Sequence, residues 1–175
     1  MHEEFISQAR TAYFSMEIAL RADIPTYSGG LGVLAGDTLR SAADLDLPLV
    51  GVTLASREGY FRQELDARGR QIEHPEPWDP AERCPCVLKA KITVPIEDRQ
   101  VWVGGWLYVL EGHRGGHQPV ILLDTDLPEN AGEDRKLTRH LYGGDAAYRL
   151  KQEMVLGVGG VRMLHALGYD IRQYH

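Results

Sequence analysis

Hydrophobic positions along the chain follow two different periods, which predicts strands and helices in alternation. Short apolar runs at 11–16, 49–54 and 119–123 are bounded by glycine, proline or polar residues, as buried strands are. Between the first two runs, apolar residues recur at helical spacing, at Leu34, Ala35, Leu39, Ala42, Ala43 and Leu45. Strands that alternate with helices predict a mainly parallel sheet, so we expect the three strands in one sheet with this helix packed on it.

The middle of the chain has an antiparallel pattern instead. Residues 59–73 predict two strands joined by a turn at 66–69, and the proline-rich stretch 74–86 predicts a surface connection. Alternating apolar residues from 87 to 110 then indicate antiparallel strands. The expected fold class is therefore α/β with an antiparallel β insertion.

Helical periodicity returns toward the end of the chain. We expect helices at 133–141 and 148–167, the second of them long and apolar on one side. Gly168 has the position of a helix C-cap, and the residues after it open a further strand that is cut at His175. Because a domain is not expected to stop inside a strand, the sequence predicts that residues 1–175 are a truncated chain.

Composition and charge narrow the class of protein. The 175 residues are 43% hydrophobic and 25% charged, which is typical of soluble globular proteins. No apolar run approaches the roughly 18 residues that a membrane span requires. The net charge of −6 and the lack of a basic run argue against nucleic-acid and membrane partners. Cys84 and Cys86 lie too close together for an ordinary disulfide, so we expect reduced thiols in a cytoplasmic protein.

The residue types that bind metals or hydrolyse glycosides show no matching pattern. The histidines are scattered, without an H-x-x-x-H or H-E-x-x-H motif, so no metal site is expected. Asp124 and Asp126 end a predicted strand with one residue between them, and we expect their side chains on opposite sides of it. This argues against the paired carboxylates of a glycosidase. Trp102 and Trp106 lie in an alternating segment and fit sheet packing better than a platform for sugars.

The stretch YSGGLGVLAGD at 27–37 contains four glycines at the start of the predicted helix. The first N–H groups of a helix have no internal acceptor and lie at its positive end, so they attract phosphate or another oxyanion. Gly29, Gly30 and Gly32 would leave room for such a ligand, but a tight turn with close helix packing also explains them. Neither a Walker loop nor a G-x-G-x-x-G motif is present, so the residues alone leave both interpretations open.

Several longer stretches resemble the α-glucan (glycogen/maltodextrin) phosphorylases, most closely the shorter bacterial form. In chain order they are AYFSMEIAL, IPTYSGGLGVLAGDTLRSAADLDLPLVGVTL, GYFRQ, LLDTDLPEN and LYGGDAAYRLKQEMVLGVGG. The resemblance implies part of the N-terminal Rossmann-like domain of a two-domain GT-B-type glycosyltransferase, whose C-terminal cofactor domain this chain lacks. It also implies reversible phosphorolysis of α-1,4-glucan by inorganic phosphate to glucose 1-phosphate, catalysed by a complete enzyme that is a homo-oligomer.

The resemblance further implies a cofactor and site residues. Pyridoxal 5′-phosphate acts through its phosphate group and is held as a Schiff base by a lysine of the C-terminal domain. The residues Gly29, Gly30, Leu31 and Gly32 match the family's helix N-terminus that faces the substrate phosphate and sugar, and Tyr13 matches a tyrosine near the cofactor.

Asp145 matches an acid in a mobile loop at the mouth of the family's active site, although its position also fits a helix N-cap. Arg149, Lys151 and Glu153 fit a solvated helix face, with support of that loop as the alternative. The chain by itself is expected to be inactive, because the resemblance assigns half of the cleft to the missing domain.

Two other functions stay open from the sequence. One is a catalytically inert glucan- or phosphate-binding domain. The other is the N-terminal part of a glycogen or starch synthase, whose loop also carries Gly-Gly-Leu-Gly. Synthases usually place a lysine shortly before that loop, where this sequence has Thr26, Tyr27 and Ser28, so the phosphorylases are favoured.

Overall fold

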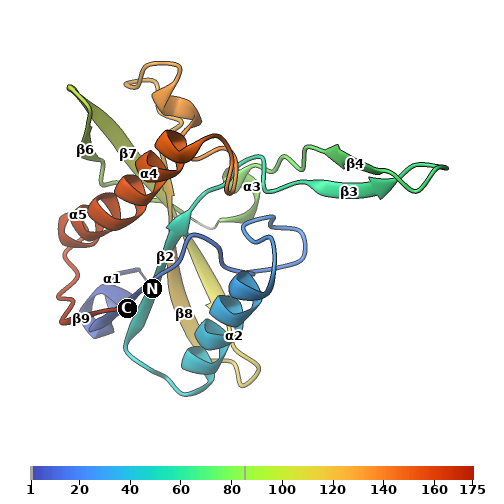
Figure 1. The fold of residues 1–175 in the computed structure, drawn as a ribbon. Helices are drawn as coiled ribbons and strands as arrows, with labels where there is room; N and C mark the ends of the chain where they lie inside the picture. The colour runs from blue at the N-terminus through green and yellow to red at the C-terminus, as the bar shows by residue number, and fades with distance from the viewer. Residues whose placement is uncertain (1, 85) are drawn as a thin grey trace.

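A mixed sheet forms the centre of the computed structural model, which describes residues 2–84 and 86–175 (Figure 1). Four of its strands run parallel, in the spatial order β9 (Gln173–Tyr174), β1 (Thr11–Phe14), β2 (Leu49–Leu54) and β8 (His117–Asp124). The prediction that the three apolar runs share one sheet is confirmed. The strand expected after Gly168 is β9, which pairs with β1.

The antiparallel insertion is also confirmed. Strand β7 (Arg99–Glu111) pairs antiparallel with β8, and it pairs in turn with β5 (Cys86–Val87) and β6 (Ile92–Ile96). A separate hairpin of β3 (Arg62–Leu65) and β4 (Gln71–His74) projects away from the body of the molecule (Figure 1). The turn between these two strands lies at the predicted place.

Helices cover both faces of the sheet. Helix α2 (Gly30–Asp44) covers one face, where its buried residues pack with side chains of β8 such as Val120 and Leu122. The other face is covered by α4 (Ala146–Met154), the π-helical turn η2 (Val155–Gly159) and α5 (Gly160–Ala166). There Ile121 and Leu123 meet residues such as Val155, because successive side chains of a strand alternate between the faces.

The helix expected at 133–141 is wrong, since only the 3-10 turn η1 (Asp134–Lys136) forms there. Tertiary contacts override the local pattern: buried Asp134 accepts hydrogen bonds from Arg99, and buried Thr138 donates to Asp124. The predicted helix at 148–167 is present as α4, η2 and α5 in succession. Two short helices were not expected, α1 (His2–Gln8) and α3 (Pro80–Arg83).

The apolar face predicted for α2 is only partly buried. Ala35, Leu39, Ala42 and Ala43 are buried as expected, but Leu34 and Leu45 are 62% and 63% exposed. The stripe that packs on the sheet is therefore narrower than the sequence pattern. In the described part of the chain, no helix is long and apolar enough to cross a membrane. Cys84 and Cys86 are both free thiols.

A substitution at Gly160 tests whether α5 packs closely on the sheet. A Cβ at this position would press into the Phe14 ring and lie 3.0 Å from Val52 Cγ1, so we expect Gly160→Ala to lower the free energy of unfolding by about 1–3 kcal/mol. Gly157→Ala is the matched control in the same helical stretch, because its Cβ would meet nothing within 4 Å. Urea unfolding of both variants measures the difference, and equal stabilities would contradict the packing described.

Candidate active site

The connections that follow three parallel strands all leave the sheet at its carboxyl edge. They are residues 15–29 after β1, 55–61 after β2 and 125–145 after β8. Ligands of open α/β sheets bind outside this edge. The segments are joined there, since Leu141 donates its N–H to the carbonyl of Gly59, and a Cβ on Gly59 would lie 2.7 Å from Pro25.

The N-terminus of α2 opens to solvent at this edge. Its N-cap residue, Gly29, has extended backbone and, as a glycine, has no side chain that could cap the helix. A Cβ at Gly29 or Gly30 would meet no atom within 4 Å. No other part of the described chain therefore covers the helix at Gly29 and Gly30, which lie at the positive end of the helix dipole.

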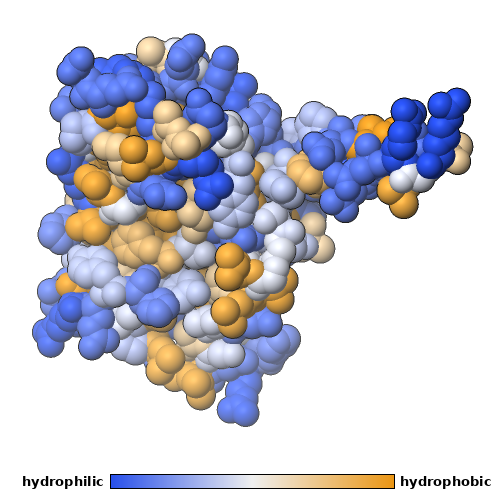
Figure 2. All heavy atoms as spheres, viewed as in Figure 1, coloured by the Kyte–Doolittle hydropathy of each residue, from blue (hydrophilic) through white to orange (hydrophobic). Residues whose placement is uncertain are grey.

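Gly32, the third glycine of the loop, is required for packing and not for access to a ligand. A Cβ at Gly32 would lie 2.6 Å from Tyr27 Cβ and 2.7 Å from Glu17 Oε2, so this position is closed by packing. Both interpretations of the glycine loop thus apply, at different residues. Next to it Leu31 is 69% exposed, and Val33 and Leu34 are exposed as well. Figure 2 shows hydrophobic residues at the surface over α2, beside the open helix end.

Glu17 is the site residue that the sequence interpretation missed. It is only 3% exposed, and its Oε2 accepts hydrogen bonds from the N–H groups of Ser28 (2.7 Å) and Gly29 (3.2 Å) and from the Ser28 hydroxyl. Burial raises the pKa of Glu17. These hydrogen bonds, together with one from the hydroxyl of Tyr142, outweigh this effect, so the pKa is lowered and the carboxylate is charged. A lone acid inside the apolar stretch AYFSMEIAL was the available signal, because a buried charge requires partners.

Tyr13 lies in β1 on the same face of the sheet as α2 and is half-buried. Its ring stacks on that of His175, with 5.2 Å between centroids. Gly30 and Asp145 are exposed. The residues matched to the family's cleft are thus not enclosed in the core of this chain.

Asp145 is the N-cap of α4, where its side chain accepts the N–H of Tyr148 at 2.9 Å, as the N-cap interpretation expected. The loop before it, residues 141–145, is called the gate loop below. Arg149 places its guanidinium 4.6 Å from the ring centre of Tyr142 and so supports this loop. Lys151 instead pairs with Glu97 at the surface, as on a solvated face.

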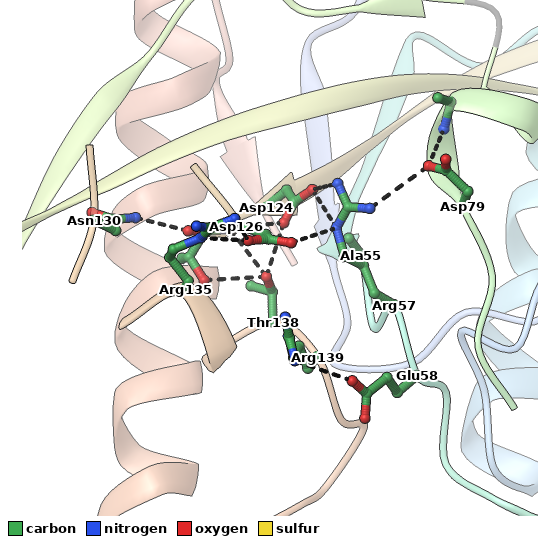
Figure 3. A network of polar contacts seen from close by, with 12 residues as sticks. Ala55, Arg57, Glu58, Asp79, Asp124, Asp126, Asn130, Arg135, Thr138 and Arg139 are labelled. Carbon is green, nitrogen blue, oxygen red and sulfur yellow. Dashed lines mark hydrogen bonds and ion pairs between the residues drawn. The ribbon is translucent and has the colours of Figure 1, made fainter. Parts of the chain in front are cut away.

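A second polar cluster fixes the loops that follow β2 and β8 (Figure 3). Buried Asp124 accepts two hydrogen bonds from Arg57, at 2.7 and 3.0 Å, and one from the indole N–H of Trp106. Asp126 lies 3.9 Å from the same guanidinium, so the prediction of opposite sides is wrong. Residues two apart in an extended chain point to the same side, so alternation itself favours this proximity. In addition, β8 ends at Asp124, and the N–H of Asp126 binds the Asp124 carboxylate.

This cluster stabilises the loops and does not resemble the catalytic carboxylate pair of a glycosidase. Its carboxylates are neutralised by Arg57 and, at Asp126, also by Arg135. Trp106 takes part in the packing of the sheet, as expected. Within residues 2–84 and 86–175, no group of three or more His, Cys, Asp or Glu side chains is arranged to hold a metal ion.

This chain is similar in sequence to known carbohydrate phosphorylases. Residues 18–101 match the carbohydrate phosphorylase family. This chain is a relative of the carbohydrate phosphorylases. It is 40% identical over 169 residues to a maltodextrin phosphorylase of Thermococcus litoralis, and this match covers 93% of the chain and 20% of the relative.

Other phosphorylases match over the same extent. A glycogen phosphorylase of Mycobacterium tuberculosis is 42% identical over 167 residues, which covers 89% of the chain and 18% of the relative. The chain thus spans about a fifth of the length of these phosphorylases. The resemblance inferred from the sequence is confirmed.

The Arg57–Asp124 pair is expected to be essential for stability. Asp124→Asn removes the closest and most buried of the charged partners of Arg57, and breaking such a pair costs about 3–5 kcal/mol. Asp79→Asn is the control, because Asp79 is exposed and lies 3.6 Å from the same guanidinium, so its loss costs about 1 kcal/mol or less. Chemical unfolding of both variants checks this, and similar losses would contradict it.

Proposed function

We propose that this chain forms the N-terminal, glucan- and phosphate-binding part of an α-glucan phosphorylase. The reaction is the reversible phosphorolysis of α-1,4-glucan to glucose 1-phosphate, a glycosyl transfer to inorganic phosphate. The observation that carries the proposal is the open N-terminus of α2 at the carboxyl edge of the sheet, in a chain related to carbohydrate phosphorylases.

The chemistry of this helix end supports the proposal. Gly29, Gly30, Leu31 and Gly32 form the start of the helix, where backbone N–H groups stabilise an oxyanion without adding a proton donor that competes with the reaction. The N–H of Gly29 is bonded to Glu17, so the N–H groups of Gly30, Leu31 and Gly32 are the ones proposed to bind the ligand. The clear space at Gly29 and Gly30 fits a phosphate group or a sugar hydroxyl. Asp145 and the gate loop then border the entrance of the cleft.

The complete protein is proposed to have two facing Rossmann-like domains of the GT-B type and to carry pyridoxal 5′-phosphate. The residues present fit this cofactor only as neighbours, since Tyr13 offers an aromatic ring near the carboxyl end of β1 and the Schiff-base lysine belongs to the other domain. When bound, the cofactor supplies its phosphate group to the reaction. A cytoplasmic homo-oligomer without nucleic-acid or membrane partners completes the proposal.

Expression of the complete reading frame that contains these residues tests the function. With maltodextrin, inorganic phosphate and pyridoxal phosphate, we expect release of glucose 1-phosphate, whereas the 175-residue chain alone is expected to release none. Transfer from a nucleotide sugar in place of phosphorolysis would assign a synthase. Glucan binding without turnover would assign an inert binding domain, and either result would reject the proposal.

Gly30→Ala tests the role of the helix end in the complete protein. The new Cβ meets no protein atom, so folding is expected to be unchanged or slightly more stable. It occupies the space of the ligand, so kcat is expected to fall by about 10²–10³-fold, as for loss of one oxyanion donor.

Gly32→Ala is the matched control for this prediction. Its Cβ meets Tyr27 and Glu17, so thermal stability is expected to fall instead. Thermal unfolding and the rate per folded molecule, measured on the same preparations, separate the two effects. A Gly30→Ala variant with wild-type turnover would show that the loop is a turn and not a binding site.

A further inference from the structure

The buried carboxylate of Glu17 connects two loops that are far apart in the chain. Its Oε2 accepts the N–H groups of Ser28 and Gly29, in the glycine loop. Its Oε1 accepts the hydroxyl of Tyr142, at 2.9 Å, in the gate loop. The two loops are thus bonded to the two oxygens of one side chain, although 125 residues separate Glu17 from Tyr142.

Both partners are held in the protonation states that this bond requires. The lowered pKa of Glu17 keeps it a carboxylate, which accepts hydrogen bonds at both oxygens. Burial and the hydrogen bond to Glu17 raise the pKa of Tyr142 to about 12, so its hydroxyl keeps the proton that it donates. The bond is therefore charge-assisted at neutral pH.

The gate loop contains an unfavourable backbone conformation, which this bond helps to hold. Tyr142 has φ of 57° and Gly144 has φ of 72°, and the left-handed region is unfavourable for a tyrosine. The hydroxyl contact with Glu17 and the guanidinium of Arg149 over the ring hold Tyr142 in this conformation. When Tyr142 moves away, a buried carboxylate oxygen loses its donor, which is unfavourable unless Glu17 also shifts and releases Ser28 and Gly29.

We propose that Glu17 and Tyr142 form a latch that couples the gate loop to the glycine loop, so that the two sides of the site open together. Glu17 is in this view a positioning residue, which acts through the N–H groups of the glycine loop. Its consequence for turnover rests on the proposed function, since the gate loop would then order the anion-binding helix end only when it is closed. The coupling itself does not depend on that function.

Amide hydrogen exchange of the 175-residue chain, measured by NMR, tests the latch. Tyr142→Phe keeps the ring over Arg149 and removes only the hydroxyl. We expect the amides of Ser28 and Gly29 to exchange about 5- to 150-fold faster, the usual range of coupling between sites. The amide of Leu122, in the middle of the sheet, is expected to keep its wild-type rate.

Tyr148→Phe is the matched control. Its hydroxyl donates to the carbonyl groups of Lys136 and Leu137 and not to Glu17, so the amides of Ser28 and Gly29 are expected to stay at wild-type rates. Wild-type exchange of Ser28 and Gly29 in Tyr142→Phe would overturn the latch. So would an equal acceleration in Tyr148→Phe.

If Tyr142→Phe unfolds, the amide of Leu122 will also exchange faster. In that case the coupling is tested from the other side, by changing Glu17 and measuring the gate loop. The variant is Glu17→Gln, and the quantity measured is the exchange rate of the Leu141 amide. Leu141 lies at the start of the gate loop, and its N–H donates to the carbonyl of Gly59. Because coupling is reciprocal, this amide is expected to exchange faster, and a wild-type rate would overturn the latch. Neither measurement involves glucan or phosphate, so failure of the latch and failure of the proposed function are distinguished.

Discussion

Parallel pairing of β1, β2 and β8 is the constraint on which the rest of the structure depends. Parallel neighbours cannot be joined by a tight turn, so the chain must return to the opposite end of the sheet between them. Between β2 and β8 the return is made within the sheet, by the antiparallel strand β7. Helix α2 makes such a return across one face, and α4, η2 and α5 make one across the other before β9 joins the sheet. The loops that follow the strands are consequently brought to one edge, where the candidate site lies.

Two buried carboxylates organise this edge, and each is stabilised in a different way. Asp124 is paired with a guanidinium and fixes the bases of the loops after β2 and β8. Among the residues that the structure describes, no cation is bonded to Glu17, which is held by N–H and hydroxyl donors from the glycine loop and the gate loop. The first cluster is a rigid support, whereas the second depends on loops that present strained or glycine-rich backbone.

Much of the fold followed from periodicity. The three core strands and the antiparallel insertion were predicted from short or alternating apolar patterns, and α2 was predicted from helical spacing. The hairpin was predicted from its turn at 66–69, because its strands are largely polar. The segment 133–141 was not, since Asp134 and Thr138 are used for bonds to Arg99 and Asp124, which no local pattern reveals. The exposed Leu34 and Leu45 show likewise that an apolar residue on a helix need not face the sheet.

The sequence by itself determined the α/β class, the relation to the phosphorylases and the glycine-rich start of α2, because these depend on residue types at short spacing. Only the tertiary structure decided which glycine is open and which is closed, because that depends on atoms of Glu17 and Tyr27 placed by other segments. It alone also brought Glu17 to Tyr142 and Asp126 to Arg57. Contacts across such separations arise when the sheet brings the ends of its strands together, which local periodicity does not encode.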